Sequence, residues 1–311
     1  MRFAMVFPGQ GSQSVGMLAG YGDMRAIRET LAEASDILKQ DVGKLMAEGP
    51  AEQLNSTVNT QPIMVVAGLC AWRAWHELGG AEPELLAGHS LGEYTALVAG
   101  GAISLADCLP LVRLRGQAMQ EAVPQGKGAM AAILGLDEAA VNTACAEAAQ
   151  GEVCEAVNFN APAQVVIAGH AGAVQRGMEA AKARGAKRAV SLPVSAPFHS
   201  SLMAPAAARL REALAEITVH APRVPIVHNV DVKSHADAAA IKKALVAQAD
   251  HPVRWVECVR EMAARGVTHV FECGPGKVLA PLVRRIAEGL HGSALADRAG
   301  LDHGVQLSRG E

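Results

Sequence analysis

The sequence has no excess of basic residues and no apolar run long enough to span a membrane. Its 28 Lys and Arg residues face 31 Asp and Glu residues, giving a formal net charge of -3, whereas nucleic-acid-binding domains are usually strongly basic. The apolar runs at residues 63–72 and 95–106 stop well short of the roughly 20 residues that a transmembrane helix needs. We therefore expect neither a nucleic-acid-binding protein nor a membrane protein.

Common metal and nucleotide motifs are also missing. No two of the six cysteines are spaced as Cys-x-x-Cys, and no His-Glu-x-x-His motif occurs, so we expect no metal. Residues 9–11 read Gly-x-Gly, but position 14 is serine, and Lys277 lacks the upstream glycine of a phosphate loop, so we expect no nucleotide cofactor. The N-terminal apolar stretch is too short for a signal peptide, and scattered cysteines then favour a reducing cytoplasm.

Helical and strand patterns alternate along much of the chain. With 50% hydrophobic and 19% charged residues, 311 residues suffice for one large domain, or for a main domain with a smaller insert. The alternation predicts an α/β core with a largely parallel sheet. Strands are expected at residues 2–7, 85–87, 226–229 and 268–272, with helices between them that include one starting at Pro62.

The middle of the chain has a different order of elements. Residues 129–194 are predicted to form β-α-β-β-α-β, which is the ferredoxin-like arrangement. We expect a small inserted domain at residues 126–196 and a catalytic domain made of residues 1–125 and 197–311. The residues after Ser293 are polar and unpatterned, which predicts a loose tail.

The segment GHSLG at residues 88–92 has the pattern G-x-S-x-G between an expected strand and an expected helix. In that context the two glycines permit a sharp turn that exposes the hydroxyl of Ser90 as a nucleophile. The same turn would aim the Leu91 N–H at the reacting oxygen, beside the positive end of the helix. The alternative is a purely structural turn between strand and helix.

A serine nucleophile needs a base, and the chain has eleven histidines. His89 is next to Ser90, but adjacent residues on such a turn usually point apart. His199 lies in a loop where the chain returns to the main domain, and such loops often carry catalytic groups. The other interpretation of His199 is a structural histidine with satisfied hydrogen bonds.

Two further segments are candidates for the site. The turn at residues 8–11 could supply the Gln10 N–H as a second oxyanion donor, or it could be a plain tight turn. Arg113 and Arg115 lie in a helix predicted over residues 105–122. Arginine at a site commonly grips a carboxylate or phosphate, although a solvated helix face is the simpler interpretation.

Taken together, these segments resemble the malonyl-CoA:acyl carrier protein transacylase family of fatty acid synthesis. The resemblance runs from about residue 3 to about residue 290, with the motifs in the family's order, and it implies an α/β-hydrolase-like domain with a ferredoxin-like insert. The segments that carry it are FPGQGSQ at 7–13, GHSLGEY at 88–94, Arg115-Gly116, NFN at 158–160, FHS at 198–200 and GPGK at 274–277.

The resemblance implies roles for individual residues. Ser90 would carry the acyl group, His199 would be its base, and the backbone carbonyl of Gln248 would orient the histidine. Gln10 and Leu91 would donate the oxyanion hole, and Arg115 would pair with the malonyl carboxylate. His89 and Asn160 match positions that line the site, and Phe198 is expected to narrow the pocket.

The implied reaction is a ping-pong transfer from malonyl-CoA to acyl carrier protein by a monomer without a cofactor. Three alternatives stay open. A thioesterase or esterase would share the serine, base and oxyanion hole. A non-catalytic module could bind the carrier protein, although intact Ser90 and His199 argue against that. A malonyl transferase could instead serve polyketide synthesis or malonate decarboxylation.

Overall fold

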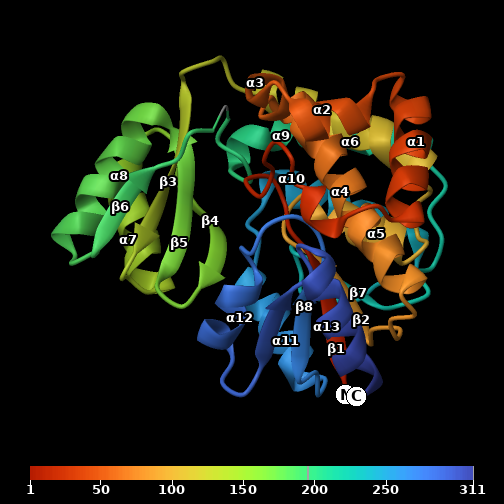
Figure 1. The fold of residues 1–311 in the computed structure, drawn as a ribbon. Helices are drawn as coiled ribbons and strands as arrows, with labels where there is room; N and C mark the ends of the chain where they lie inside the picture. Colours follow the sequence, from red (N-terminus) through yellow and green to blue (C-terminus); the bar gives the residue numbers. More distant parts are fainter. Residues whose placement is uncertain (195, 311) are drawn as a thin grey trace.

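The computed structural model describes residues 1–194 and 196–310, which form two α/β lobes side by side (Figure 1). The larger lobe is built on a five-stranded sheet in the order β7-β2-β1-β8-β9, and every pairing in it is parallel. The predicted α/β core with a parallel sheet is confirmed. Its strands are β1 (Phe3–Phe7), β2 (Leu85–Gly88), β7 (Ile226–Val227), β8 (His269–Glu272) and β9 (His291–Ala294).

The central strand β1 is apolar throughout because both of its faces are buried. Phe3, Met5 and Phe7 point into the core beneath helix α4 (Thr57–Glu77), whereas Ala4 and Val6 point into a second core. This alternation follows from the two-residue period of a strand. Unbroken apolar runs are typical of parallel strands covered on both sides.

Helices cover both faces of the parallel sheet (Figure 1). On one face lie α1 (Arg25–Leu38), α4, α5 (Gly92–Ala99), α6 (Leu105–Glu121), α9 (Ala204–Ala215) and α10 (Ala238–Asp250). On the other face lie α11 (Trp255–Ala264) and α12 (Ala280–Ile286). Short helices α2 (Val42–Glu48) and α3 (Ala51–Leu54), and 3-10 turns at Ala19–Tyr21 and Ser201–Met203, complete this lobe. Among the described residues, no helix is long and apolar enough to cross a membrane.

The smaller lobe has the predicted β-α-β-β-α-β order, and its sheet is antiparallel in the order β4-β5-β3-β6. One face of this sheet packs on its two helices, while Met130, Val157 and Val166 on the other face pack with Phe198 toward the larger lobe. The elements are β3 (Gly128–Leu134), α7 (Glu138–Ala149), β4 (Cys154–Ala161), β5 (Gln164–His170), α8 (Ala171–Ala183) and β6 (Arg188–Ser191).

Two sequence expectations are wrong. Helix α4 begins at Thr57 and contains Pro62 instead of starting there. The residues after Ser293 are not a loose tail, because they complete β9 and form helix α13 (Arg298–Arg309), capped by the Asp297 carboxylate, which accepts from the Gly300 N–H at 2.7 Å. Leu301 and Val305, one turn apart on α13, pack in the main core, so the helix is amphipathic although its composition is polar.

The packing of α13 generates a stability prediction. Leu301 is fully buried in the main core, whereas His303 on the same helix is exposed. Leu301→Ala should lower the free energy of unfolding by about 2–5 kcal/mol, because it leaves a cavity. His303→Ala should change it by less than about 0.5 kcal/mol. Urea denaturation measures both, and equal small effects would show that α13 is not part of the folded core.

Candidate active site

The turn at Ser90 joins the end of β2 to the start of α5. Ser90 has a left-handed backbone with φ +52°, which is unusual for a residue with a side chain. A Cβ on Gly88 would lie 1.8 Å from the carbonyl carbon of Gly92, and a Cβ on Gly92 would lie 2.0 Å from the oxygen of Phe7. Both positions therefore require glycine, and the turn presents the Ser90 hydroxyl at the carboxyl edge of the sheet.

Side chains from two other elements hold this turn. The Ser90 N–H donates to Asn229 Oδ1 at 2.8 Å, and Asn229 Nδ2 donates to the Gly88 carbonyl at 2.7 Å. Gln248 Nε2 in α10 donates to the Ser90 carbonyl at 2.9 Å. Asn229 and Gln248 are both fully buried, so the backbone on each side of Ser90 is fixed by hydrogen bonds inside the protein.

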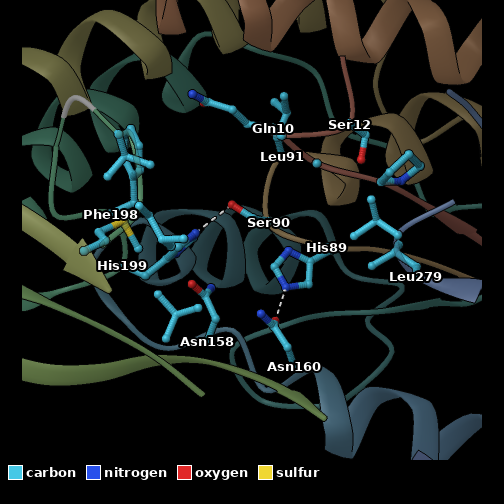
Figure 2. Close-up of a pocket in the computed structure, with 18 of the residues that line it drawn as sticks. Gln10, Ser12, His89, Ser90, Leu91, Asn158, Asn160, Phe198, His199 and Leu279 are labelled. Carbon is cyan, nitrogen blue, oxygen red and sulfur yellow. Dashed lines mark hydrogen bonds between the residues drawn. The ribbon is translucent and has the colours of Figure 1, made fainter. Parts of the chain in front are cut away.

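His199, and not His89, is the histidine at the nucleophile (Figure 2). Ser90 Oγ lies 2.6 Å from His199 Nε2, and His199 Nδ1 lies 2.8 Å from the backbone oxygen of Gln248. A carbonyl can only accept, so the imidazole carries its proton on Nδ1 and leaves Nε2 free to accept from Ser90. His89 Nε2 instead pairs with Asn160 Oδ1 at 2.7 Å.

The environment of His199 keeps its imidazole neutral. Burial, followed by the nearby charge of Arg115, lowers its pKa to about 3, although the Gln248 carbonyl partly opposes the shift. A neutral imidazole beside a serine hydroxyl is ready to accept its proton. Here a backbone carbonyl takes the place that a carboxylate holds in the Ser-His-Asp triad.

Arg115 brings a buried positive charge to the same point. Its side chain is in α6, with a relative exposure of 2%. It donates to Gln61 Oε1 at 2.9 Å, to Gln248 Oε1 at 3.0 Å and to Ser90 Oγ at 3.3 Å, and its guanidinium carbon lies 5.4 Å from the centre of the Tyr94 ring. All of these partners are uncharged, and Nε has no partner among the described residues.

A buried guanidinium stays charged in a protein, and a buried charge is costly unless it is paired. The site is therefore suited to an anionic ligand group next to Ser90. Arg113, the other arginine candidate, is not at the site. It donates to Gln40 Oε1 at 2.7 Å and to the Leu38 carbonyl at 3.4 Å.

The two expected oxyanion donors lie beside each other near Ser90 (Figure 2). The loop that carries Gln10 packs on the nucleophile turn so closely that a Cβ on Gly9 would lie 2.5 Å from the His89 oxygen. Neither the Gln10 N–H nor the Leu91 N–H donates to another residue within 1–194 and 196–310. Both are thus available to an oxygen placed over Ser90.

These groups line one cavity of about 290 Å³ between the two lobes. Met130, Asn160 and Val166 line it from the antiparallel sheet, and Phe198 and Leu279 from the larger lobe. A pocket of this size, mostly apolar with a few polar groups, suits a small ligand group. Within the described ranges, no cluster of three His, Cys, Asp or Glu residues is arranged to hold a metal ion.

Sequence reasoning gave no role to Asn229, Gln61 or Glu93. Asn229 follows the short strand β7, and the carboxyl end of a parallel strand is where site residues gather, so its position was a usable signal. Glu93 was another, since it is the only charged residue in the otherwise apolar helix α5. Gln61 lies near the start of α4, just before the apolar run of that helix, and nothing in the local pattern distinguishes it.

The sequence matches the acyl transferase domain family over residues 4–298. The chain belongs to the acyl transferase family. The chain is an acyltransferase.

The similarity to known proteins extends over nearly the whole chain. The malonyl CoA-acyl carrier protein transacylase of Salmonella typhimurium is 55% identical over 96% of this chain and 97% of its own length. The structure of an acyl-carrier-protein S-malonyltransferase from Burkholderia pseudomallei is 61% identical, with a TM-score of 0.97, and covers 98% of this chain and 100% of that one.

A second similar structure contains a carrier protein. It is a malonyl transacylase in complex with a type II PKS acyl carrier protein, and it is 49% identical with a TM-score of 0.97. The match covers 99% of this chain and 100% of that one.

The low pKa of His199 gives a pH prediction for this acyltransferase. A histidine whose pKa is about 3 stays neutral from pH 8 to pH 5.5. The second-order rate constant for modification of Ser90 by phenylmethanesulfonyl fluoride should therefore be nearly flat over this range. A base with an ordinary pKa near 6.5 would make it fall about tenfold.

The matched control is His199→Ala, which should slow the same modification at least about 100-fold at every pH, because the general base is gone. A rate constant that declines with a midpoint near pH 6.5 would contradict the neutral, buried imidazole.

Proposed function

We propose that this chain transfers a malonyl group from malonyl-CoA to the phosphopantetheine thiol of acyl carrier protein through a malonyl-Ser90 intermediate. The observation that carries the proposal is the buried, carboxylate-free guanidinium of Arg115, which lies 3.3 Å from Ser90 Oγ. A malonyl thioester has its free carboxylate two bonds from the carbonyl that Ser90 attacks. The names of the relatives above support the same substrates.

In the first step, Ser90 Oγ attacks the thioester carbonyl while its proton passes to His199 Nε2. The developing oxyanion receives hydrogen bonds from the N–H groups of Gln10 and Leu91. Each such donor should lower the barrier by about 3–4 kcal/mol. The His199 imidazolium that forms is stabilised by the carbonyl of Gln248, 2.8 Å from Nδ1.

The tetrahedral intermediate then collapses, and His199 returns its proton to the departing CoA sulfur. The malonyl group is now an ester on Ser90. In the second half-reaction, the thiol of the carrier protein gives its proton to His199 and attacks that ester. Reversal of the same steps releases Ser90 and the malonyl thioester of the carrier protein, which is ping-pong chemistry.

Arg115 supplies the selectivity for malonyl over acetyl groups. A carboxylate in contact with its guanidinium should contribute about 1.5–3 kcal/mol per hydrogen bond. An acetyl group would leave the charge buried with only neutral partners. Phe198 is half-buried in the pocket wall beside His199, and its ring should disfavour branched analogues of the malonyl group.

The proposal extends to the organisation and setting of the enzyme. Residues 1–125 and 197–311 would form the catalytic domain, and residues 126–196 a small domain that closes one side of the pocket, as its own hydrophobic clusters suggest. All six cysteines are free and buried, which suits a reducing cytoplasm. The structural relative with a bound carrier protein supports acyl carrier protein as the acceptor.

The decisive experiment is the intact mass of the purified protein after mixing with malonyl-CoA alone, beside Ser90→Ala. The expected result is a gain of one malonyl group, absent in the variant and discharged by pantetheine. Steady release of CoA without an adduct would indicate a hydrolase instead. No adduct and no CoA release would reject the substrate.

Arg115→Ala should separate the two acyl groups. Only the malonyl group has a carboxylate that loses its partner in this variant. The kcat/KM for malonyl-CoA should therefore fall roughly 100-fold, while that for acetyl-CoA changes less than about fivefold. Arg113→Ala is the matched control, because Arg113 is in the same helix but its side chain does not reach the pocket. Equal losses on both substrates would exclude this role of Arg115.

A further inference from the structure

We infer that Glu93 is a positioning residue whose carboxylate fixes the nucleophile, the base and the substrate-binding arginine relative to one another. The inference rests on the proposed function for its substrate but concerns a residue that never touches that substrate. Glu93 is in α5, three residues beyond Ser90, and is fully buried. Burying a carboxylate costs free energy unless its oxygens are hydrogen-bonded. The presence of Glu93 in an otherwise apolar helix therefore needs a reason.

The hydrogen bonds of Glu93 converge from two separate segments. His228 Nδ1 lies 2.7 Å from Oε1, while the Asn229 N–H donates to Oε2 at 2.9 Å and Gln248 Nε2 donates to the same oxygen at 3.0 Å. His228 is a buried ion-pair partner of this carboxylate, and no Lys or Arg of the described residues forms an ion pair with it. The other two partners, Asn229 and Gln248, are the residues that hold the nucleophile turn.

The first connection runs through Asn229 to the nucleophile. With its own N–H held by Glu93, the Asn229 side chain bridges the Ser90 N–H and the Gly88 carbonyl, at 2.8 and 2.7 Å. Both groups lie on the N-terminal side of the left-handed backbone at Ser90. Without Glu93, the loop after β7 would lose the hydrogen bond that positions the backbone of Asn229. The backbone of Ser90 could then relax toward an ordinary, negative φ.

The second connection runs through Gln248 to the base and to Arg115. The Gln248 amide nitrogen faces three acceptors: the Ser90 carbonyl at 2.9 Å, Glu93 at 3.0 Å and Asn229 Oδ1 at 3.3 Å. Its oxygen therefore faces the Arg115 guanidinium at 3.0 Å. The backbone oxygen of the same residue orients His199. Only one amide orientation satisfies all of these groups, and the carboxylate of Glu93 is the one charged acceptor that favours it.

The test is pre-steady-state CoA release from malonyl-CoA by Glu93→Gln, which removes the charge and keeps the shape. A displacement of the reacting groups by a fraction of an ångström should slow acylation roughly 10- to 100-fold, with full burst amplitude and little change in KM. A purely structural role would lower the burst amplitude, because fewer molecules fold, but would not slow those that remain active.

Glu272→Gln is the matched control. Glu272 is also fully buried, but its carboxylate accepts from the N–H groups of Val278, Leu279 and Ala280 and does not contact the nucleophile turn. It should lower the melting temperature while leaving the acylation rate constant within about threefold of wild type. If Glu93→Gln does not fold, Glu93→Asp is the variant to measure. Its shorter side chain cannot place the carboxylate within reach of His228, Asn229 and Gln248 together, so it should also slow acylation.

The inference is overturned if the folded Glu93 variant acylates within twofold of wild type, if only burst amplitude is lost, or if Glu272→Gln is slowed equally. Modification by phenylmethanesulfonyl fluoride distinguishes a wrong substrate assignment from a wrong role for Glu93. If wild type reacts with this reagent but not with malonyl-CoA, the substrate is wrong. The slower reaction of Glu93→Gln with the reagent would still establish positioning, and an unchanged reaction would reject it.

Discussion

The active site depends on one strained backbone conformation, the left-handed turn at Ser90. For a residue with a Cβ, this conformation costs about 1–2 kcal/mol, and it persists because the surroundings permit no other. Gly88 and Gly92 have no room for a side chain, and the backbone of the turn is bonded on both sides by Asn229 and Gln248. The nucleophile is therefore placed by the fold, before any substrate arrives.

The electrostatics of the pocket follow from a single buried cation. Arg115 has only neutral partners, and after burial its charge is the largest cause of the low pKa of His199. A malonyl carboxylate would neutralise that charge, so binding of the correct substrate should raise the basicity of His199. The same contact that selects the acyl group thus assists the proton transfer, and an acyl group without a carboxylate gains neither benefit.

Much of this arrangement could be predicted from the sequence, because the signals were local. The G-x-S-x-G segment fixed Ser90 between a strand and a helix, and the β-α-β-β-α-β pattern identified the small lobe. The choice between His89 and His199 was different, since residues 109 positions apart had to meet. The loop position of His199 favoured it only weakly, and the family resemblance decided the prediction. Asn229 and Glu93 escaped prediction because their function lies in long-range hydrogen bonds. Helix α13 escaped prediction because the segment is polar in composition and contains two glycines, although Leu301 and Val305 lie one turn apart on one face.

We propose that His199 acts as a neutral base, oriented by the Gln248 carbonyl without a carboxylate. The most direct test of this proposal is the nitrogen-15 NMR titration of the histidines, with His199 assigned by comparison with His199→Gln. We expect a neutral His199 ring with its proton on Nδ1 from pH 8 down to pH 5, because the pKa of His199 is about 3. A His199 ring that becomes an imidazolium near pH 6, or that carries its proton on Nε2, would contradict it.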